Sequence, residues 1–240
     1  MVSYFGEVVH PSSRAFWNDD DDDEAFHCHE DNLGFSINWT NEEPVTIKKF
    51  ILIEGQIVAE FTLSCVLKDA DIVGNIENKS EKPVAKIYKI DDVYICVIDS
   101  NSDLTEAGEL TKTLSHLLSK IEKLYAITAD HLSNLKSTEE IDSESTLKLL
   151  CSSKAAKENN FKDCILNQPN IVTGLSAGVL TYADIQDIFC IIYILYTDTF
   201  DLDSKNASPL TKLFSTLMEK PIPQFKTSGP CFFNKGNLYM

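Results

Sequence analysis

Basic residues are scarce in this 240-residue chain. It has 21 Lys and Arg against 37 Asp and Glu, which gives a formal net charge of -16 at pH 7. Nucleic acids and anionic membrane surfaces attract basic patches. The deficit therefore argues against both as partners, and it favours a protein that stays soluble or meets basic protein surfaces.

The chain also lacks an uninterrupted apolar segment of the roughly 20 residues that a membrane-spanning helix needs. At its N-terminus no basic region precedes an apolar stretch, so we expect no signal peptide. The 7 cysteines are an odd number, widely spaced and mostly embedded in apolar runs, which is typical of reduced core thiols. We therefore expect a cytoplasmic protein, with the nucleus as a second compartment.

Recognisable catalytic motifs are missing as well. Ser176 lacks the G-x-S-x-G elbow of a hydrolase, and Gly55 lacks the further glycines or the Lys-Ser/Thr pair of a nucleotide loop. His27, Cys28 and His29 are adjacent, whereas structural zinc sites usually separate paired ligands by two or more residues. We expect no catalytic residue, cofactor or metal, and an α/β enzyme with a dispersed site stands as an alternative.

What the sequence does contain is an organising stretch from Gln168 to Asp198. Apolar residues recur there at helical spacing, at Leu175, Val179 and Tyr182, and an uncharged, largely apolar run follows from Phe189 to Tyr196. A half-exposed strand would alternate polar with apolar residues, so the second run predicts a strand buried on both faces. A helix that leads into such a strand is typical of α/β architecture.

Shorter apolar runs predict the rest of a sheet. An Asp91-Asp92 pair separates two of them at the length of a hairpin turn. The predicted strands are residues 3–9, 35–39, 49–54, 85–90, 93–98 and 124–128.

Four further segments predict helices. The longest has an apolar stripe from Leu104 to Ile121 and Asp103 as its cap. The others run from Ile57 to Cys65, around Thr146 to Cys151, and from a start at Ser208-Pro209 with a buried face of Leu210, Leu213, Phe214, Leu217 and Met218. Together the elements predict an α/β fold with a central mixed β-sheet flanked by helices.

The composition changes at both ends of this region. An unbroken acidic run, Asp19 to Glu24, predicts a disordered loop over about residues 18–32, with a tether for a basic partner patch as the alternative interpretation. We expect one α/β domain over residues 1–222 and a flexible C-terminal tail over residues 223–240, because Pro221 and Pro223 prevent the last helix from continuing.

The order of several motifs resembles the proteasome core-particle assembly chaperone family. Over residues 35–150 the similarity is mainly one of element order. The matching residues are Phe5–Val9, the acidic insertion behind them, Phe161–Asp163, Gln168–Val172, Leu175, Ala177, Val179–Leu180, Tyr182 and Tyr196–Asp198.

This resemblance implies a noncatalytic chaperone that forms a heterodimer with proteasome assembly chaperone 2, binds proteasome α subunits and promotes formation of their ring. It also implies that a C-terminal hydrophobic-Tyr-any (HbYX) motif, here Leu238, Tyr239 and Met240, inserts into a pocket between α subunits. The free carboxylate, the tyrosine ring and the leucine side chain suit such capture. A general acidic interaction scaffold is the third hypothesis.

Overall fold

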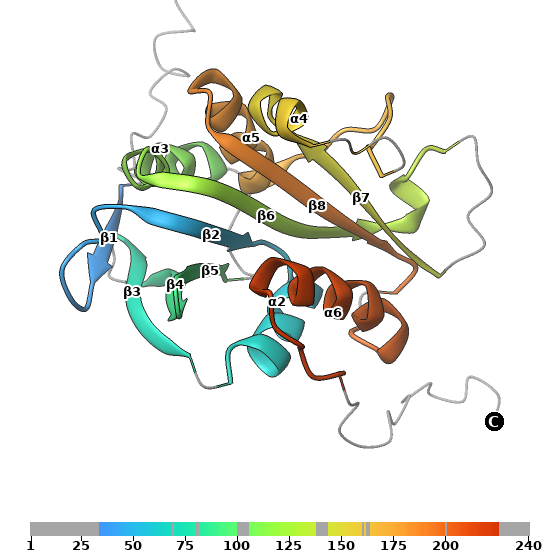
Figure 1. Cartoon of the computed structure of the whole chain (residues 1–240), viewed down its shortest axis with the longest axis horizontal. Coiled ribbons are helices and arrows are strands. Elements are labelled where there is room, and N and C mark those ends of the chain that lie inside the picture. Colours follow the sequence, from blue (N-terminus) through green and yellow to red (C-terminus); the bar gives the residue numbers. More distant parts are fainter. Residues whose placement is uncertain are drawn as a thin grey trace, which may run out of the picture. The chain divides into compact units, whose positions relative to one another are not determined.

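Eight strands form one mixed sheet in the computed structural model, in the order β1-β3-β4-β5-β2-β6-β8-β7 (Figure 1). The structure describes residues 34–68, 70–79, 82–99, 106–137, 144–159, 161, 164–199 and 201–225. The predicted strand at residues 3–9 and the predicted acidic loop lie outside these ranges. The strands are β1 Phe35–Trp39, β2 Ile47–Ile53, β3 Asp71–Asn78, β4 Pro83–Ile90, β5 Val93–Ile98, β6 Ile121–His131, β7 Ser145–Cys151 and β8 Phe189–Thr197.

Helices cover both faces of the sheet, so the predicted α/β fold with a mixed sheet is confirmed. Helices α2 and α6 pack on one face, and α3 and α5 pack on the other (Figure 1). The helices are α2 Gln56–Phe61, α3 Ala107–Leu118, α4 Ser153–Glu158, α5 Gly174–Ile185 and α6 Ser204–Met218, with a π-helical turn η1 Thr62–Val66 after α2 and a 3-10 turn η3 Leu132–Asn134 after β6.

The centre of the sheet is parallel. Strand β2 pairs in parallel with β5 on one side and with β6 on the other, and β6 pairs in parallel with β8. Residues 50–53 of β2 are at most 1% exposed, and β8 is buried along its length except at the half-buried Tyr193. Strands covered on both faces are expected to be apolar without alternation. The buried strand predicted at residues 189–196 and the strand predicted at residues 49–54 are thus confirmed.

The prediction of a helix around Thr146 to Cys151 is wrong, because this segment forms strand β7. This strand lies antiparallel to β8, with Leu149 opposite Tyr193 and Leu147 opposite Leu195. A short apolar run fits either period, and here the unpaired backbone of β8 decides the outcome. A helix comes directly afterwards as α4, and the Ser152 hydroxyl caps it by accepting from Ala155 N at 3.4 Å.

Strand β3 has no counterpart among the sequence predictions. Its sequence, DIVGNIEN, contains a glycine and two asparagines, which are poor strand formers. It forms nonetheless because it pairs antiparallel with β1 on one side and β4 on the other, with a register shift between Ile72 and Gly74. Pairing across the sheet therefore outweighs local propensity in this segment.

The predicted start of the last helix at Ser208-Pro209 is also wrong, since α6 begins at Ser204. Asp203 caps the helix: its carboxylate accepts from Lys205 N and Asn206 N, while Asn206 Oδ1 accepts from Asp203 N. This capping box supplies a stronger start than a serine followed by proline, so Pro209 lies inside the helix. The predicted buried face is confirmed, from Leu210 to Met218.

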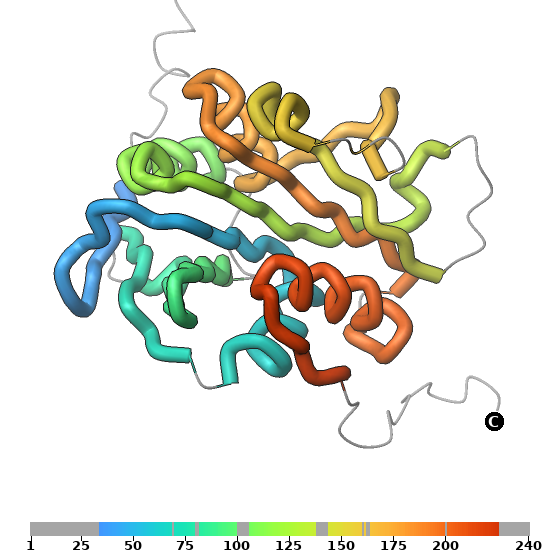
Figure 2. The backbone as a smooth tube through the Cα atoms, viewed as in Figure 1, coloured from blue at the N-terminus to red at the C-terminus, as the bar shows by residue number. Residues whose placement is uncertain are grey.

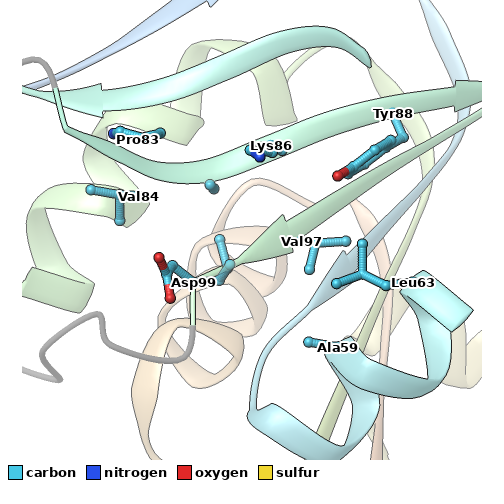
Figure 3. Close-up of a pocket in the computed structure, with 10 residues that line it drawn as sticks. Ala59, Leu63, Pro83, Val84, Lys86, Tyr88, Val97 and Asp99 are labelled. Carbon is cyan, nitrogen blue, oxygen red and sulfur yellow. The ribbon is translucent and has the colours of Figure 1, made fainter. Parts of the chain in front are cut away.

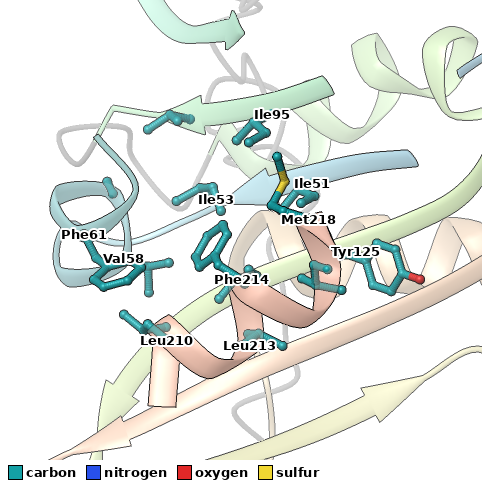
Figure 4. Close-up of a cluster of buried hydrophobic side chains, with 14 of the residues drawn as sticks. Ile51, Ile53, Val58, Phe61, Ile95, Tyr125, Leu210, Leu213, Phe214 and Met218 are labelled. Carbon is teal, nitrogen blue, oxygen red and sulfur yellow. The ribbon is translucent and has the colours of Figure 1, made fainter. Parts of the chain in front are cut away.

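The core beneath α6 predicts a large cost for truncating Phe214. Its ring is fully buried, and its centroid lies 5.6 Å from that of the equally buried Phe61 (Figure 4). We expect Phe214→Ala to lower the free energy of unfolding by about 3–5 kcal/mol, since a large cavity forms. Urea denaturation followed by circular dichroism measures this loss. The exposed Thr216→Ala, two residues away, should change the same quantity by less than about 0.5 kcal/mol, and equal losses would contradict the packing argument.

Candidate functional site

The predicted partner-binding residues Leu238, Tyr239 and Met240 lie outside the described residues, as do His27, Cys28 and His29. The structure does describe the place from which the C-terminal tail departs. It also describes the carboxyl ends of the parallel strands, where α/β proteins commonly bind ligands. These two places, and the surface of the helices, are the candidate functional regions.

The C-terminal end of α6 is tied to the central strand by Lys49. The Lys49 Nζ donates to Leu217 O at 2.6 Å and to Glu219 Oε1 at 3.0 Å. A cation at the C-terminus of a helix satisfies its last carbonyls and complements the helix dipole. The hydrogen bond and charge of Lys49 lower the pKa of the Glu219 carboxyl below its ordinary value. Strand β2 therefore fixes the point at which α6 ends.

Beyond α6 the chain turns back along the same helix, and we call residues 221–225 the tail root (Figure 2). Ile222 N donates to Ser215 Oγ at 3.2 Å, and the side chains of Ile222 and Phe225 pack against the core. Phe225 then borders a cavity of about 250 Å³ beside Ser204 and Thr211 at the other end of α6. The described part of the predicted tail, residues 223–225, thus ends beside the beginning of α6.

At the carboxyl end of β2, Glu54 caps helix α5. Its two carboxylate oxygens accept from Leu175 N and Ser176 N, each at 2.8 Å, while the N-cap residue Thr173 makes no side-chain cap bond. The N-terminus of a helix is where an α/β protein often holds a phosphate or another anion. In this chain the Glu54 carboxylate occupies that position.

The cavity at these strand ends has a volume of about 320 Å³ and is bordered by Glu54, Asp130 and Tyr196. Asp130 Oδ1 accepts from Asn134 Nδ2 at 2.8 Å and from His131 N at 2.7 Å, so this carboxylate holds the loop after β6. Burial raises the pKa of the Tyr196 hydroxyl to about 12, which keeps it protonated. The two carboxylates of the cavity are thus engaged in structural contacts, and its tyrosine is uncharged.

Neither serine chemistry nor metal binding gains support from the described residues. Ser176 is fully buried on α5, so a substrate cannot reach its hydroxyl. His131 does have a neighbour that the sequence did not indicate, since its Nδ1 lies 2.7 Å from Ser133 Oγ. The same Nδ1 accepts a hydrogen bond from Ser133 N, so the His131 side chain caps the 3-10 turn η3. Its Nε2 contacts the Asp198 carbonyl oxygen. Within the described ranges no three His, Cys, Asp or Glu side chains are grouped to hold a metal ion.

A mostly apolar cavity of about 360 Å³ opens between β4, β5 and the α2–η1 segment (Figure 3). Leu63 and Tyr88 lie on opposite sides of it, and Lys86 and Asp99 stand at its rim. Leu63 is 47% exposed, and burial raises the pKa of the Tyr88 hydroxyl. With an apolar wall and few polar groups, the cavity is suited to an apolar side chain.

The Gln168–Asn170 motif has a structural role. The Asn170 side chain accepts from Lys136 N at 2.7 Å and donates to Lys136 O at 2.9 Å and to Asn167 O at 2.7 Å. The Asn170 side-chain amide thus links its own loop to the loop at Lys136 through two hydrogen bonds, one accepted and one donated, as two paired strands exchange them. The loop leads directly to Ile171, which is 79% exposed, and to the start of α5. The sequence identified this motif without indicating the contact that it makes.

No helix in the described part of the chain is long and apolar enough to cross a membrane. The 5 described cysteines Cys65, Cys96, Cys151, Cys164 and Cys190 are free, and burial raises the pKa of the Cys96 and Cys190 thiols to about 12. These two thiols stay protonated in the core.

Comparison with known proteins gives one consistent family. The model of a family described as "Proteasome assembly chaperone 4" matches residues 1–229. A curated relative from Callithrix jacchus, "Proteasome assembly chaperone 1", is 35% identical over 123 residues, which are 48% of this chain and 41% of the relative. The Homo sapiens protein of the same name is 32% identical over the same shares. The matched region thus spans about two fifths of these curated relatives.

Solved structures show the same fold. Pyrococcus furiosus PbaA, described as an archaeal homolog of proteasome-assembly chaperone, superposes with a TM-score of 0.59 at 16% identity, over 80% of this chain and 84% of its own. Pyrococcus furiosus PbaB, described as an archaeal proteasome activator, gives 0.59 at 14% identity, over 80% of this chain and 92% of its own.

The cap at α5 gives a testable stability difference. We expect Glu54→Ala to lower the free energy of unfolding by about 2 kcal/mol, because two backbone N–H groups lose a charged acceptor. Glu54→Gln, which retains one acceptor oxygen, should give a smaller loss. Urea denaturation measures both, and hydrogen exchange of the Leu175 and Ser176 amides should accelerate. Glu60→Ala, at an exposed carboxylate on α2, is the matched control, and a loss as large as that of Glu54→Ala would disprove the capping role.

Proposed function

The chain belongs to the proteasome assembly chaperone family, and from this membership we propose that it is a noncatalytic chaperone for assembly of the proteasome core particle. The observation that carries the proposal is the family match over residues 1–229, joined by the shared fold of the archaeal structures. A family of assembly chaperones acts by binding, which agrees with the buried Ser176 and with the structural use of Glu54.

The proposed partners are proteasome assembly chaperone 2 and the α subunits of the core particle. As a heterodimer with that second chaperone, this chain binds α subunits and promotes formation of their ring. A net charge of -16 favours basic protein surfaces as binding sites and disfavours nucleic acid and anionic membranes. The proposed compartment is the cytoplasm, with the nucleus as a second location, and the free thiols of the described cysteines agree with it.

The C-terminal tail is the proposed insertion element, through Leu238, Tyr239 and Met240. From Gln224 onward the sequence has no acidic side chain and has lysines at 226 and 235, so the tail differs in charge from the acidic chain as a whole. Fifteen residues follow Phe225, and a fully extended segment of that length spans at most about 50 Å. A pocket that receives the terminal carboxylate must therefore lie within about 50 Å of Phe225.

Two tails on one dimer would strengthen capture through effective concentration, if the partner chain has a similar ending. Each tail alone should bind modestly, because ordering of a chain segment offsets part of the contact free energy. Modest individual contacts suit a chaperone that must leave the finished particle.

Removal of Leu238 to Met240 tests the insertion directly. We expect this truncation, and Tyr239→Ala alone, to weaken capture of α subunits by about tenfold or more, because the ring and its hydroxyl are lost from the pocket. Affinity purification read by mass spectrometry measures the recovery of α subunits. Asn237→Ala, which leaves the motif intact, is the control, and unchanged capture by the truncated chain would refute insertion. If the intact chain recovers no α subunits, the acidic-scaffold hypothesis is supported instead.

The chain without its partner should associate with itself. We expect expression alone to give aggregates or mixed oligomers, because an obligate heterodimer exposes apolar surface when one chain is missing. Co-expression with proteasome assembly chaperone 2 should yield a single soluble complex, and light scattering after gel filtration distinguishes the two states. A stable monomer that turns over a small substrate would favour the enzyme hypothesis.

A further inference from the structure

The exposed side of helix α5 carries no charge over most of its length. Residues 164–183 contain no Asp, Glu, Lys, Arg or His, although 24% of the whole chain is charged. Ile171 before the helix and Ile185 at its end are 79% and 75% exposed. Between them Gly174, Ala177 and Thr181 follow at helical spacing, and we call these five residues the neutral face.

The opposite side of α5 already has its partners. Leu175, Val179 and Ala183 are buried in the core against the sheet. Toward α3 the helix packs closely, since a β-carbon at Gly178 would stand 2.5 Å from Thr111 Oγ1. The neutral face is therefore additional apolar surface that the fold itself does not require.

The other long helices expose lysine or histidine along their length, whereas the charged residue of α5 is Asp184, next to its last residue. Lys112 and His116 on α3 and Lys205 and Lys212 on α6 are exposed. An exposed helix side normally carries such residues, and a helix that is uncharged on all sides is typically buried. In an acidic protein the difference points to a surface that another molecule covers.

We propose that the neutral face is the centre of the interface with the partner chaperone. This inference rests on the proposed function, because it assigns a surface to the proposed heterodimer. An uncharged face offers no counter-charge to a basic α-subunit surface, so its complement is itself apolar and neutral. A second copy of this chain is the weaker occupant, because each copy brings a net charge of -16 to the contact, and it covers the face only when the partner chaperone is missing.

The size of the face also favours a folded partner over a peptide. The 12 residues of α5 span about 18 Å, and with a helix width of about 10 Å they offer roughly 180 Å². A stable interface buries about 800 Å² on each partner, so contacts must extend to the neighbouring elements. Helix α3 lies on one side of α5, and α4 adjoins its C-terminal end, where Ser153 N donates to Asp184 Oδ1 at 2.6 Å (Figure 1).

These neighbours give the surface the usual anatomy of a protein interface. Lys112 and His116 on α3 and Lys157 on α4 are exposed on these neighbouring helices. Interfaces typically have an apolar core from which charge is depleted and a polar rim. A broad surface of this kind matches a folded chain that brings a neutral helix or sheet face.

Two matched threonines allow a direct test. Thr181 on the neutral face and Thr216 on α6 are both exposed, and each hydroxyl donates to the carbonyl four residues earlier, at 2.9 Å and 3.1 Å. We expect Thr181→Glu to weaken association with co-expressed proteasome assembly chaperone 2 by about tenfold or more, because a charge would be buried without a counter-charge. Thr216→Glu should leave the association within about twofold of the unchanged chain.

Association is measured on purified full-length complexes by gel filtration with light scattering and by titration, and folding by thermal circular dichroism. If Thr181→Glu unfolds the chain, Ile171→Lys, which lies before the helix, replaces it as the test variant. Retention of the partner by the folded neutral-face variant overturns the inference, as does an equal loss in Thr216→Glu. Loss of a homodimer with the heterodimer unchanged also overturns it. Failure of the unchanged chain to bind the second chaperone overturns the proposed function instead.

Discussion

Strand β2 holds both helix layers through two opposite charges, and the rest of the structure depends on this arrangement. Lys49 reaches the C-terminus of α6 on one face of the sheet, and Glu54 reaches the N-terminus of α5 on the other. A cation thus meets the negative end of one helix dipole and an anion meets the positive end of another. The buried residues between them, 50–53, need cover on both faces, and the two caps fix the helices that provide it.

The same arrangement fills the place where many α/β proteins hold a ligand. Parallel strands bring their carboxyl ends together beside a helix N-terminus, which is the usual ligand position of an α/β fold. Here Glu54 occupies that position, and the exposed apolar residues Ile171 and Ile185 lie away from it, on the neutral face of α5. A binding role follows more naturally from this distribution than catalysis does.

Sequence reasoning succeeded where one apolar run decides an element and failed where distant pairing decides it. The runs of β2 and β8 could be recognised because burial on both faces leaves no polar alternation. Segment 145–151 fits a helix or a strand locally, and only the edge of β8 makes it a strand. The contact of Glu54 with α5 joins residues 121 positions apart, so no local pattern indicates it. The proposed tail motif, Leu238–Met240, could be singled out from sequence because it is a local pattern.

The tail root also determines how the protein bears mechanical load. A pull on the C-terminus acts first on the contacts of Phe225 and Ile222 along α6, which lie at the surface and can separate one after the other. Only after they release does the force reach the end of α6, where Lys49 passes it to the central strand. The tail root can therefore separate from α6 while the central sheet stays folded.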